Sequence, residues 1–187
     1  MYLPASETLG IAFGLSELVL SIVRRSGTTS AATDRASLSL LWLVILAAVA
    51  AGVAAAYLVP QAHSMWLARV YPLGVAIFGC GLVLRWWAIV RLGRFFTVDV
   101  AIAADHRVVD TGPYRRVRHP AYLGVLLAFF GLGICIGNWV SLAVLTLPIL
   151  GAFLRRIAVE EAALTTALGE DYRAYARRTR RLLPFLY

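Results

Sequence analysis

Lysine is absent from this sequence of 187 residues, and cysteine and histidine are scarce, with two and three residues. Cys80 and Cys135 both fall in apolar runs, where cysteine behaves as a small hydrophobic residue, so we expect no disulfide framework. The histidines are scattered without the spacing of metal ligands. No metal site is therefore predicted.

Several motifs of soluble enzymes and of nucleic-acid-binding proteins are missing as well. No glycine-rich phosphate loop follows a predicted strand, and no Gly-x-Ser-x-Gly elbow occurs. No basic segment with interleaved aromatic residues suggests a nucleic-acid surface. These absences argue against nucleotide hydrolysis, serine-hydrolase chemistry and nucleic-acid partners.

Apolar residues, by contrast, make up 60% of the chain, and the mean hydropathy is +0.77. Because soluble domains average about 45–50% apolar residues, the composition predicts an all-α integral membrane protein. Runs long enough to span a bilayer lie at about residues 4–23, 38–59, 70–90, 121–137 and 139–155, with a turn at Gly137-Asn138. We expect about five transmembrane helices, a cytoplasmic loop and a C-terminal amphipathic helix.

The sequence contains 18 arginines, and most of them fall in three segments. These segments lie between the first and second runs, between the third and fourth, and after the fifth. The positive-inside rule places all three in the cytoplasm, with the N-terminus outside. The net charge of +8 therefore indicates membrane topology and contact with anionic lipids. The first basic residues follow the first run, so we expect that run to be retained and not cleaved as a signal peptide.

The chain is expected to form one structural unit with two parts, residues 1–90 with three membrane helices and residues 91–187 with alternating helices and polar segments. The loop from residue 91 to 119 is too long for a tight turn, and its apolar residues predict that it packs. Residues 160–178 have the pattern of an amphipathic helix, broken near Gly169, that lies at the membrane interface.

The most informative motif is GPYRRVRHPAYLG, residues 112–124. Proline suits the first turn of a helix, so Pro120 predicts where the fourth apolar helix begins. The free N–H groups of that turn would converge with nearby cationic side chains on one negative group. These side chains are Arg115, Arg116, Arg118 and His119.

A second group of residues follows the last apolar run: Arg156, Glu160 and Glu161, and then a GxxYxxY motif from Gly169 to Tyr175. The order GPYxxxRHPxYxG, hydrophobic hairpin, RxxxEExxL, GxxYxxY and a closing proline resembles the isoprenylcysteine carboxyl methyltransferase family and its phospholipid-methyltransferase relatives. The resemblance covers about residues 91–187, which would then be the methyltransferase core, whereas residues 1–90 match only as apolar helices.

The resemblance implies an S-adenosylmethionine-dependent methyltransferase that acts at the membrane interface. The cationic loop suits the cofactor's carboxylate, the two glutamates suit its ribose hydroxyls, and a tyrosine ring suits its adenine or sulfonium. In the family, the RHPxY and EE motifs form this pocket. The residues expected to contact the cofactor are Tyr114, Arg118, His119, Pro120, Tyr122, Leu123, Gly124, Glu160 and Glu161.

Arg156 is the candidate catalytic residue, because the resemblance to the family implies that it is the cation that orients a carboxylate acceptor. A carboxylate is already nucleophilic, so no general base is required. The alternative role for Arg156 is a salt bridge to Glu160 one helical turn later, worth about 0.2–0.5 kcal/mol if exposed. Both roles are compatible.

The expected acceptor is a lipophilic small molecule, in particular the carboxylate of a prenylcysteine-like compound, entering through a lateral opening between helices. A small thiol or an amine-headgroup lipid is the alternative within the enzyme class. A non-enzymatic protein that binds lipids or a partner is the alternative outside it. The chain is short and resembles the compact prokaryotic members, which predicts the inner (plasma) membrane of a prokaryote.

Two charged residues inside predicted helices are left out of the site. Glu17 lies one or two turns from Arg24 and is expected to pair with it. Arg85, which precedes Trp86 and Trp87, is expected to extend toward the membrane interface beside an aromatic belt.

Overall fold

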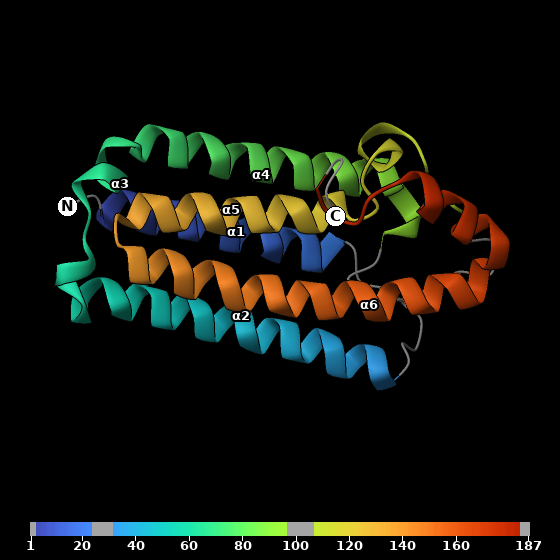
Figure 1. Cartoon of the computed structure of the whole chain (residues 1–187), viewed down its shortest axis with the longest axis horizontal. Coiled ribbons are helices and arrows are strands. Elements are labelled where there is room, and N and C mark those ends of the chain that lie inside the picture. The colour runs from blue at the N-terminus through green and yellow to red at the C-terminus, as the bar shows by residue number, and fades with distance from the viewer. Residues whose placement is uncertain (1–2, 24–31, 97–106, 184–187) are drawn as a thin grey trace.

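The computed structural model describes residues 3–23, 32–96 and 107–183, and most of them are helical (Figure 1). The long helices are α1 (Leu3–Val23), α2 (Ala32–Leu58), α4 (Tyr71–Leu92), α5 (Pro120–Ile136) and α6 (Trp139–Arg178). The short ones are η1 (Pro60–Ala62), α3 (Met65–Arg69), η2 (Gly93–Phe95) and η3 (Gly112–Arg115). The prediction of an all-α fold is confirmed.

Each of the predicted apolar runs corresponds to one of the long helices. Three segments are long and apolar enough to cross a membrane, namely Ala36–Leu58, Tyr71–Phe95 and Trp139–Leu168. The segment Pro120–Ile136 is apolar but shorter. The protein is therefore an integral membrane protein, and the count of five spans stays a prediction.

Local sequence signals set the ends of α5 and the start of α6. Pro120 is the first residue of α5, and Gly137 ends it in the left-handed conformation, with φ of 76°. The Asn138 side chain then accepts a hydrogen bond from the Ser141 N–H at 3.0 Å and donates one to the Val59 carbonyl at 2.9 Å. The predicted turn at Gly137-Asn138 is confirmed, and it fastens α5 and α6 to the end of α2.

Helix α6 consists of two parts, because Gly169 has non-helical angles with φ of 57°. The first part runs the length of the bundle, and the second turns back over the end where α4 ends and α5 begins (Figure 1). Tyr172 and Tyr175 of the second part are buried. The predicted break near Gly169 is confirmed.

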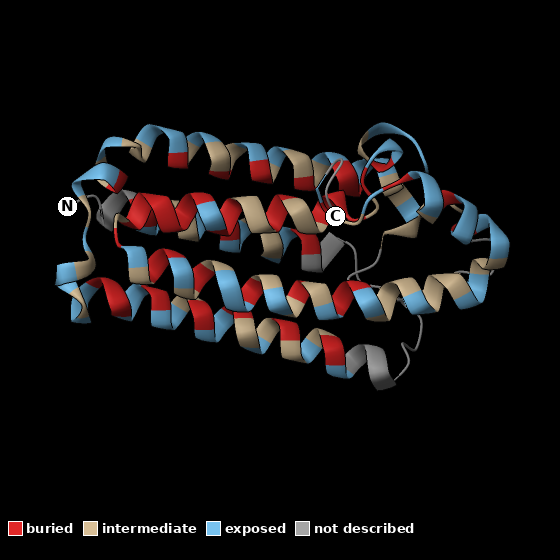
Figure 2. Ribbon diagram, viewed as in Figure 1, coloured by how far each residue is buried: buried red, intermediate tan, exposed pale blue. Residues whose placement is uncertain are grey.

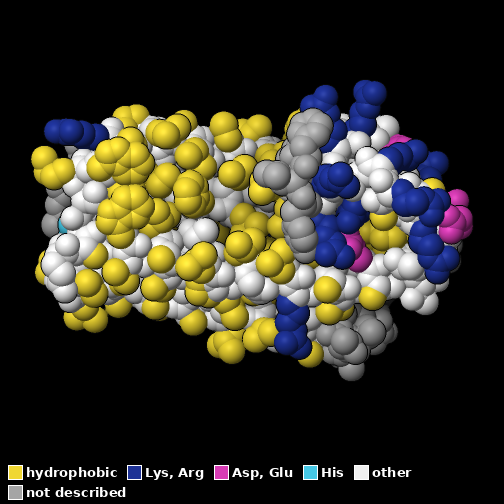
Figure 3. Space-filling model, in the orientation of Figure 1, with side chains coloured by type: hydrophobic (Ala, Val, Ile, Leu, Met, Phe, Trp, Pro, Cys, Tyr) yellow, Lys and Arg dark blue, Asp and Glu magenta, His cyan; other side chains and the backbone are white. Residues whose placement is uncertain are grey.

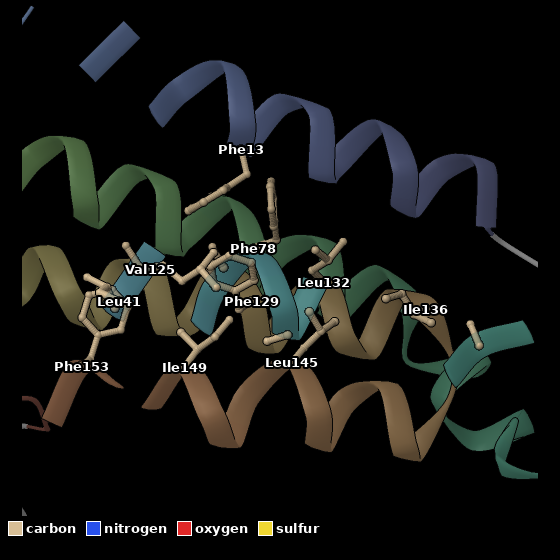
Figure 4. Packing of buried hydrophobic residues seen from close by; sticks show 14 residues of the cluster. Phe13, Leu41, Phe78, Val125, Phe129, Leu132, Ile136, Leu145, Ile149 and Phe153 are labelled. Atoms are coloured by element: carbon tan, nitrogen blue, oxygen red, sulfur yellow. The ribbon is translucent and has the colours of Figure 1, made fainter. Parts of the chain in front are cut away.

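Helix α5 is the central element and the one with the most buried residues (Figure 2). It packs closely against α4, while α1 packs mainly against α5 and α2 packs against α6. The buried side chains between these helices form one apolar cluster (Figure 4). The labelled members are Phe13, Leu41, Phe78, Val125, Phe129, Leu132, Ile136, Leu145, Ile149 and Phe153.

Glycines allow α4 and α5 to approach each other closely. A Cβ atom added at Gly81 would lie 2.5 Å from the Gly124 carbonyl oxygen, and one added at Gly131 would lie 2.5 Å from the Gly74 carbonyl oxygen. Small residues commonly mediate helix contacts in membranes, where the lipid supplies no hydrophobic force between helices. The glycines recur every seven residues on each helix, and this repeat is the sequence signal for the contact.

Charged side chains gather at the end of the bundle where α6 turns back, and apolar side chains cover most of the remaining surface in this view (Figure 3). The packing expected of the 91–119 loop is confirmed for Phe96 and Val109, which contact buried Ala88 and Ala121. Val98, Val100 and Ile102 lie outside the described residues. The molecule thus has an apolar belt and one strongly cationic end.

Gly81→Ala should destabilise the fold, because its Cβ would collide with the backbone of α5. We expect a loss of about 1–3 kcal/mol, measured as a lower midpoint of thermal unfolding in detergent. Gly79→Ala is the matched control on the same helix, since its Cβ would meet nothing within 4 Å. Equal losses in both variants would contradict the close α4–α5 contact.

Candidate active site

Two segments far apart in the sequence pair at the cationic end of the bundle. The Arg118 N–H donates to the Arg180 carbonyl at 2.7 Å, and the His119 N–H donates to the Arg181 carbonyl at 3.0 Å. The Arg180 N–H donates back to the Arg116 carbonyl at 3.0 Å. The segment after α6 therefore lies along the RHP motif and covers the start of α5.

Glu161 is the negative group on which the motif converges. Its Oε1 accepts a hydrogen bond from Arg118 Nε at 2.7 Å and lies 3.3 Å from His119 Nε2, and its Oε2 accepts from Arg181 Nε at 2.9 Å. Arg115 and Arg116, which we expected at the same anion, are exposed. The convergence is thus within the protein, between Arg118, His119 and the second glutamate of the EE motif.

Arg118 has a second set of partners that anchors the part of α6 after Gly169. Its Nη1 donates to the carbonyls of Ala176 and Thr179 at 3.0 and 2.6 Å. Charge-assisted bonds of this kind are about twice as strong as neutral ones. Arg118 therefore joins the loop, the carboxylate and the end of α6.

Glu160 is the more open of the two carboxylates, with 26% of its side chain exposed against 13% for Glu161. Its Oε2 accepts a hydrogen bond from the Tyr122 hydroxyl at 2.7 Å. The Tyr122 ring stacks on His119, with ring centroids 5.6 Å apart, and also contacts the Phe153 ring, with centroids 4.9 Å apart. These contacts hold the carboxylate of Glu160 in a partly exposed position.

Tyr172 is a further candidate site residue, and its position in the GxxYxxY motif does not by itself predict a role. Its hydroxyl is buried and has no hydrogen-bond partner among the described residues. Burial raises the pKa of Tyr172, and the charges of Glu161 and Glu160 raise it further, so the hydroxyl stays a neutral donor. The GxxYxxY motif marks this residue, but its spacing alone does not show that the hydroxyl lacks a partner.

The other residues expected to contact the cofactor are packed against other parts of the protein. Tyr114 is buried against Ala88 and Ala121, and its carbonyl accepts a hydrogen bond from the Tyr175 hydroxyl at 2.8 Å. Pro120 is buried at the start of α5, and Leu123 is half-buried one turn later. Gly124 faces the backbone of α4 at Gly81.

A pocket lies beside this network, and Arg156 lines it. Arg156 is only 1% exposed and donates a hydrogen bond to Ser37 Oγ of α2 at 2.5 Å. The pocket measures about 60 Å³. Its lining is mostly apolar: Phe13, Leu20, Leu38, Leu41, Trp42, Ile45, Phe96, Tyr122, Val125 and Phe153, with the charged residues Glu17, Arg85 and Arg156.

The expectation for Arg85 was wrong. Arg85 is buried at 8% exposure, and its Nη2 donates to Glu17 Oε2 at 2.6 Å. The expected partner of Glu17, Arg24, lies outside the described residues. The packing of α1 near the start of α5 brings Glu17 and Arg85 together, a contact across 68 residues that no local pattern predicts.

Comparison with known proteins identifies the chain. The model of the isoprenylcysteine carboxyl methyltransferase (ICMT) family matches residues 73–166, about half of the sequence. The chain belongs to this family, and it is an integral membrane methyltransferase. The resemblance seen in its motifs is confirmed.

Individual relatives carry the same description. A probable protein-S-isoprenylcysteine O-methyltransferase of Oryza sativa subsp. indica is 33% identical over 133 residues, which cover 70% of this chain and 69% of the relative. The protein-S-isoprenylcysteine O-methyltransferase of Schizosaccharomyces pombe is 34% identical over 120 residues, covering 63% of this chain and 51% of the relative.

The fold also matches a solved structure. The structure of the eukaryotic intramembrane Ras methyltransferase ICMT (isoprenylcysteine carboxyl methyltransferase) has a TM-score of 0.73 to this chain. The match covers 99% of this chain and 67% of that protein, at 24% sequence identity. The arrangement of helices is therefore shared along nearly the whole chain.

Glu161→Ala should destabilise the protein more than Glu160→Ala. The first change leaves Arg118 and Arg181 without their carboxylate, whereas the second removes one hydrogen bond to Tyr122. We expect losses of about 2–3 kcal/mol and about 0.5–1.5 kcal/mol, measured by thermal unfolding in detergent. A larger loss for Glu160→Ala would show that Glu161 is not the centre of the network.

Proposed function

We propose that this protein transfers a methyl group from S-adenosylmethionine to the carboxylate of a lipophilic, prenylcysteine-like acceptor. The main support for this proposal is a buried arginine, Arg156, that lines a mostly apolar pocket close to the partly exposed carboxylate of Glu160. Arg156 lines the pocket at 1% exposure, and Glu160 follows it by one turn of α6. Tyr122 joins the two regions, since it lines the pocket and donates to Glu160.

The residues around Glu160 suit the methyl donor. S-adenosylmethionine, when bound, supplies an electrophilic methyl group on a sulfonium cation. The open carboxylate of Glu160 would accept hydrogen bonds from ribose hydroxyls, and the unpartnered hydroxyl of Tyr172 would donate to the same ligand. The RHP segment would face the donor's carboxylate, with Glu161 holding Arg118 and His119 in place. The other residues expected to lie against the donor are Tyr114, Pro120, Tyr122, Leu123 and Gly124.

Arg156 would hold the acceptor's carboxylate. A guanidinium binds a carboxylate through two parallel hydrogen bonds, which fix its orientation as well as its position. The carboxylate is already deprotonated and needs no general base, and the apolar walls would exclude water from it. Orientation of this kind supplies up to about 7–11 kcal/mol of barrier reduction in well-aligned model reactions.

The size of the pocket suggests how a lipophilic acceptor would be held. Its volume of about 60 Å³ is small compared with the roughly 300–1,000 Å³ of sites that enclose a whole ligand. We infer that the pocket takes the acceptor's polar head, and that the hydrocarbon tail extends between α1 and α2 into the bilayer. Both helices line the pocket, and each packs mainly on a different partner.

The names of the relatives support a carboxylate acceptor, because they describe O-methyltransferases of protein S-isoprenylcysteine. The pocket supports it too, since an amine acceptor would enter as a cation beside Arg156. The arginine-rich end would face the cytoplasm, where the positive-inside rule puts it, and the N-terminus would lie outside in a prokaryotic inner (plasma) membrane. Residues 91–187 would supply the methyltransferase core and residues 1–90 the remaining membrane helices.

Calorimetric titration of S-adenosylmethionine into the detergent-purified protein tests the donor site. We expect saturable binding that Glu160→Ala weakens about 10-fold or more, because hydrogen bonds to a charged group contribute about 1.5–3 kcal/mol. Glu170→Ala is the control, since Glu170 is an exposed carboxylate of α6 paired with Arg177. Absence of binding to the folded wild-type protein would overturn the proposal.

Kinetics of an Arg156 variant test the acceptor site. Arg156→Met keeps the volume of the side chain and removes its charge, so turnover of an S-farnesylcysteine derivative should fall about 100-fold, as misplacement of a reacting group does. Affinity for S-adenosylmethionine should change less than about threefold. Arg155→Met is the matched control, because Arg155 is exposed beside Arg156. A parallel loss of cofactor affinity would move Arg156 into the donor site instead.

A further inference from the structure

Helix α2 contributes a polar side chain to the surroundings of Arg156, although it precedes residues 73–166, the part of the chain that the family model matches. Arg156 Nη1 donates a hydrogen bond to Ser37 Oγ at 2.5 Å. Ser37 is 7% exposed and Arg156 is 1% exposed, so the bond is shielded from water. The serine thus contacts the same guanidinium that would hold the acceptor's carboxylate.

The packing of α2 against α6 explains why Ser37 lies opposite Arg156. The two helices run side by side (Figure 1), and Ser141 Oγ of α6 donates to the Gly52 carbonyl of α2 at 2.7 Å. Arg156 follows Ser141 by 15 residues along α6. Ser37 precedes Gly52 by the same number along α2. One antiparallel register of the two helices therefore accounts for both bonds.

A hydroxyl oxygen suits an arginine that has to bind an anionic ligand. It accepts the Nη1 N–H without carrying a charge, so it orients the guanidinium and does not neutralise it. Arg85, the other arginine of the pocket, pairs instead with the carboxylate of Glu17 at 2.6 Å. Because a guanidinium is planar, fixing the direction of one Nη atom also fixes the plane in which a carboxylate can bind.

We propose that Ser37 is a positioning residue that acts through Arg156 and sets its orientation for the acceptor's carboxylate. The inference rests on the proposed function and adds to it a residue from the part of the chain outside the family match. Arginine has several rotatable bonds, and holding it in one conformation before the acceptor binds lowers the entropic cost of ordering it later. Loss of the serine oxygen would therefore misalign the carboxylate and leave the donor site intact.

The test measures turnover of an S-farnesylcysteine derivative in proteoliposomes at saturating S-adenosylmethionine, together with cofactor affinity by calorimetry in detergent. Ser37→Ala should lower kcat about 10-fold or more, because misplacement of a reacting group is costly. Its affinity for S-adenosylmethionine should stay within about threefold of the wild-type value, which is less than 1 kcal/mol. Ser39→Ala is the matched control, since Ser39 is exposed on the same helix.

Two further variants separate the hydrogen bond from the space that the side chain fills. Ser37→Thr keeps the hydroxyl and should keep most of the turnover. Ser37→Cys keeps the approximate size of the side chain but accepts hydrogen bonds weakly, so it should be as slow as Ser37→Ala. The cysteine variant also tests the proposal if the alanine variant does not fold.

A double-mutant cycle distinguishes positioning from a role in the fold alone. If Ser37 acts through Arg156, then Ser37→Ala should change the residual turnover of Arg156→Met by less than about threefold. A serine that serves only the packing of α2 would lower turnover by the same factor in both backgrounds.

Several outcomes would overturn the positioning role while the proposed function stands. These are equal turnover in Ser37→Ala and Ser39→Ala, equal slowing by Ser37→Ala in the wild-type and Arg156→Met backgrounds, a parallel loss of cofactor affinity, or a Ser37→Thr variant as slow as Ser37→Ala. If the wild-type protein binds S-adenosylmethionine but does not methylate the acceptor, the proposed function itself fails, and the inference fails with it.

Discussion

The carboxylate of Glu161 joins segments of the chain that are far apart in the sequence. It pairs with Arg118 and contacts His119 from the loop before α5, and it pairs with Arg181 from the segment after α6. Because α6 is broken at Gly169, its last part is free to turn back, and the Arg118 bonds to Ala176 and Thr179 hold it there. The network keeps Glu160, Tyr122 and Tyr172 in fixed positions before any ligand binds, which reduces the cost of ordering them later.

The bilayer imposes the second constraint. Charged groups are costly in lipid, so those inside the bundle are paired or hydrogen-bonded to other helices. Arg85 pairs with Glu17 and donates to the Ala121 carbonyl at the start of α5, and Arg156 donates to Ser37. A water-soluble methyl donor and a lipid-soluble acceptor could thus meet at the membrane interface, with Tyr122 between them. The need to bind both a water-soluble donor and a lipid-soluble acceptor explains why one short chain would combine an apolar belt with a dense group of arginines.

Much of the fold could be predicted from the sequence, because length and composition determine where helices occur. The positions of the apolar runs, the Gly137-Asn138 turn and the break at Gly169 all follow from local signals. The order of motifs also identified the family. The partners of charged residues could not be predicted, since Glu17 and Arg85 are 68 residues apart and Ser37 and Arg156 are 119 apart. Periodicity shows which face a residue occupies, but which helix that face meets is decided by packing of the whole bundle.

If a carboxylate oxygen is the atom that this protein methylates, the product is a methyl ester, which mass spectrometry identifies. Proteoliposomes of the wild-type protein would be incubated with methyl-deuterated S-adenosylmethionine and N-acetyl-S-farnesylcysteine. We expect a labelled methyl ester, which mild base converts back to the acid with release of labelled methanol. A product whose label resists base, or no labelled product from protein that binds the donor, would contradict this expectation.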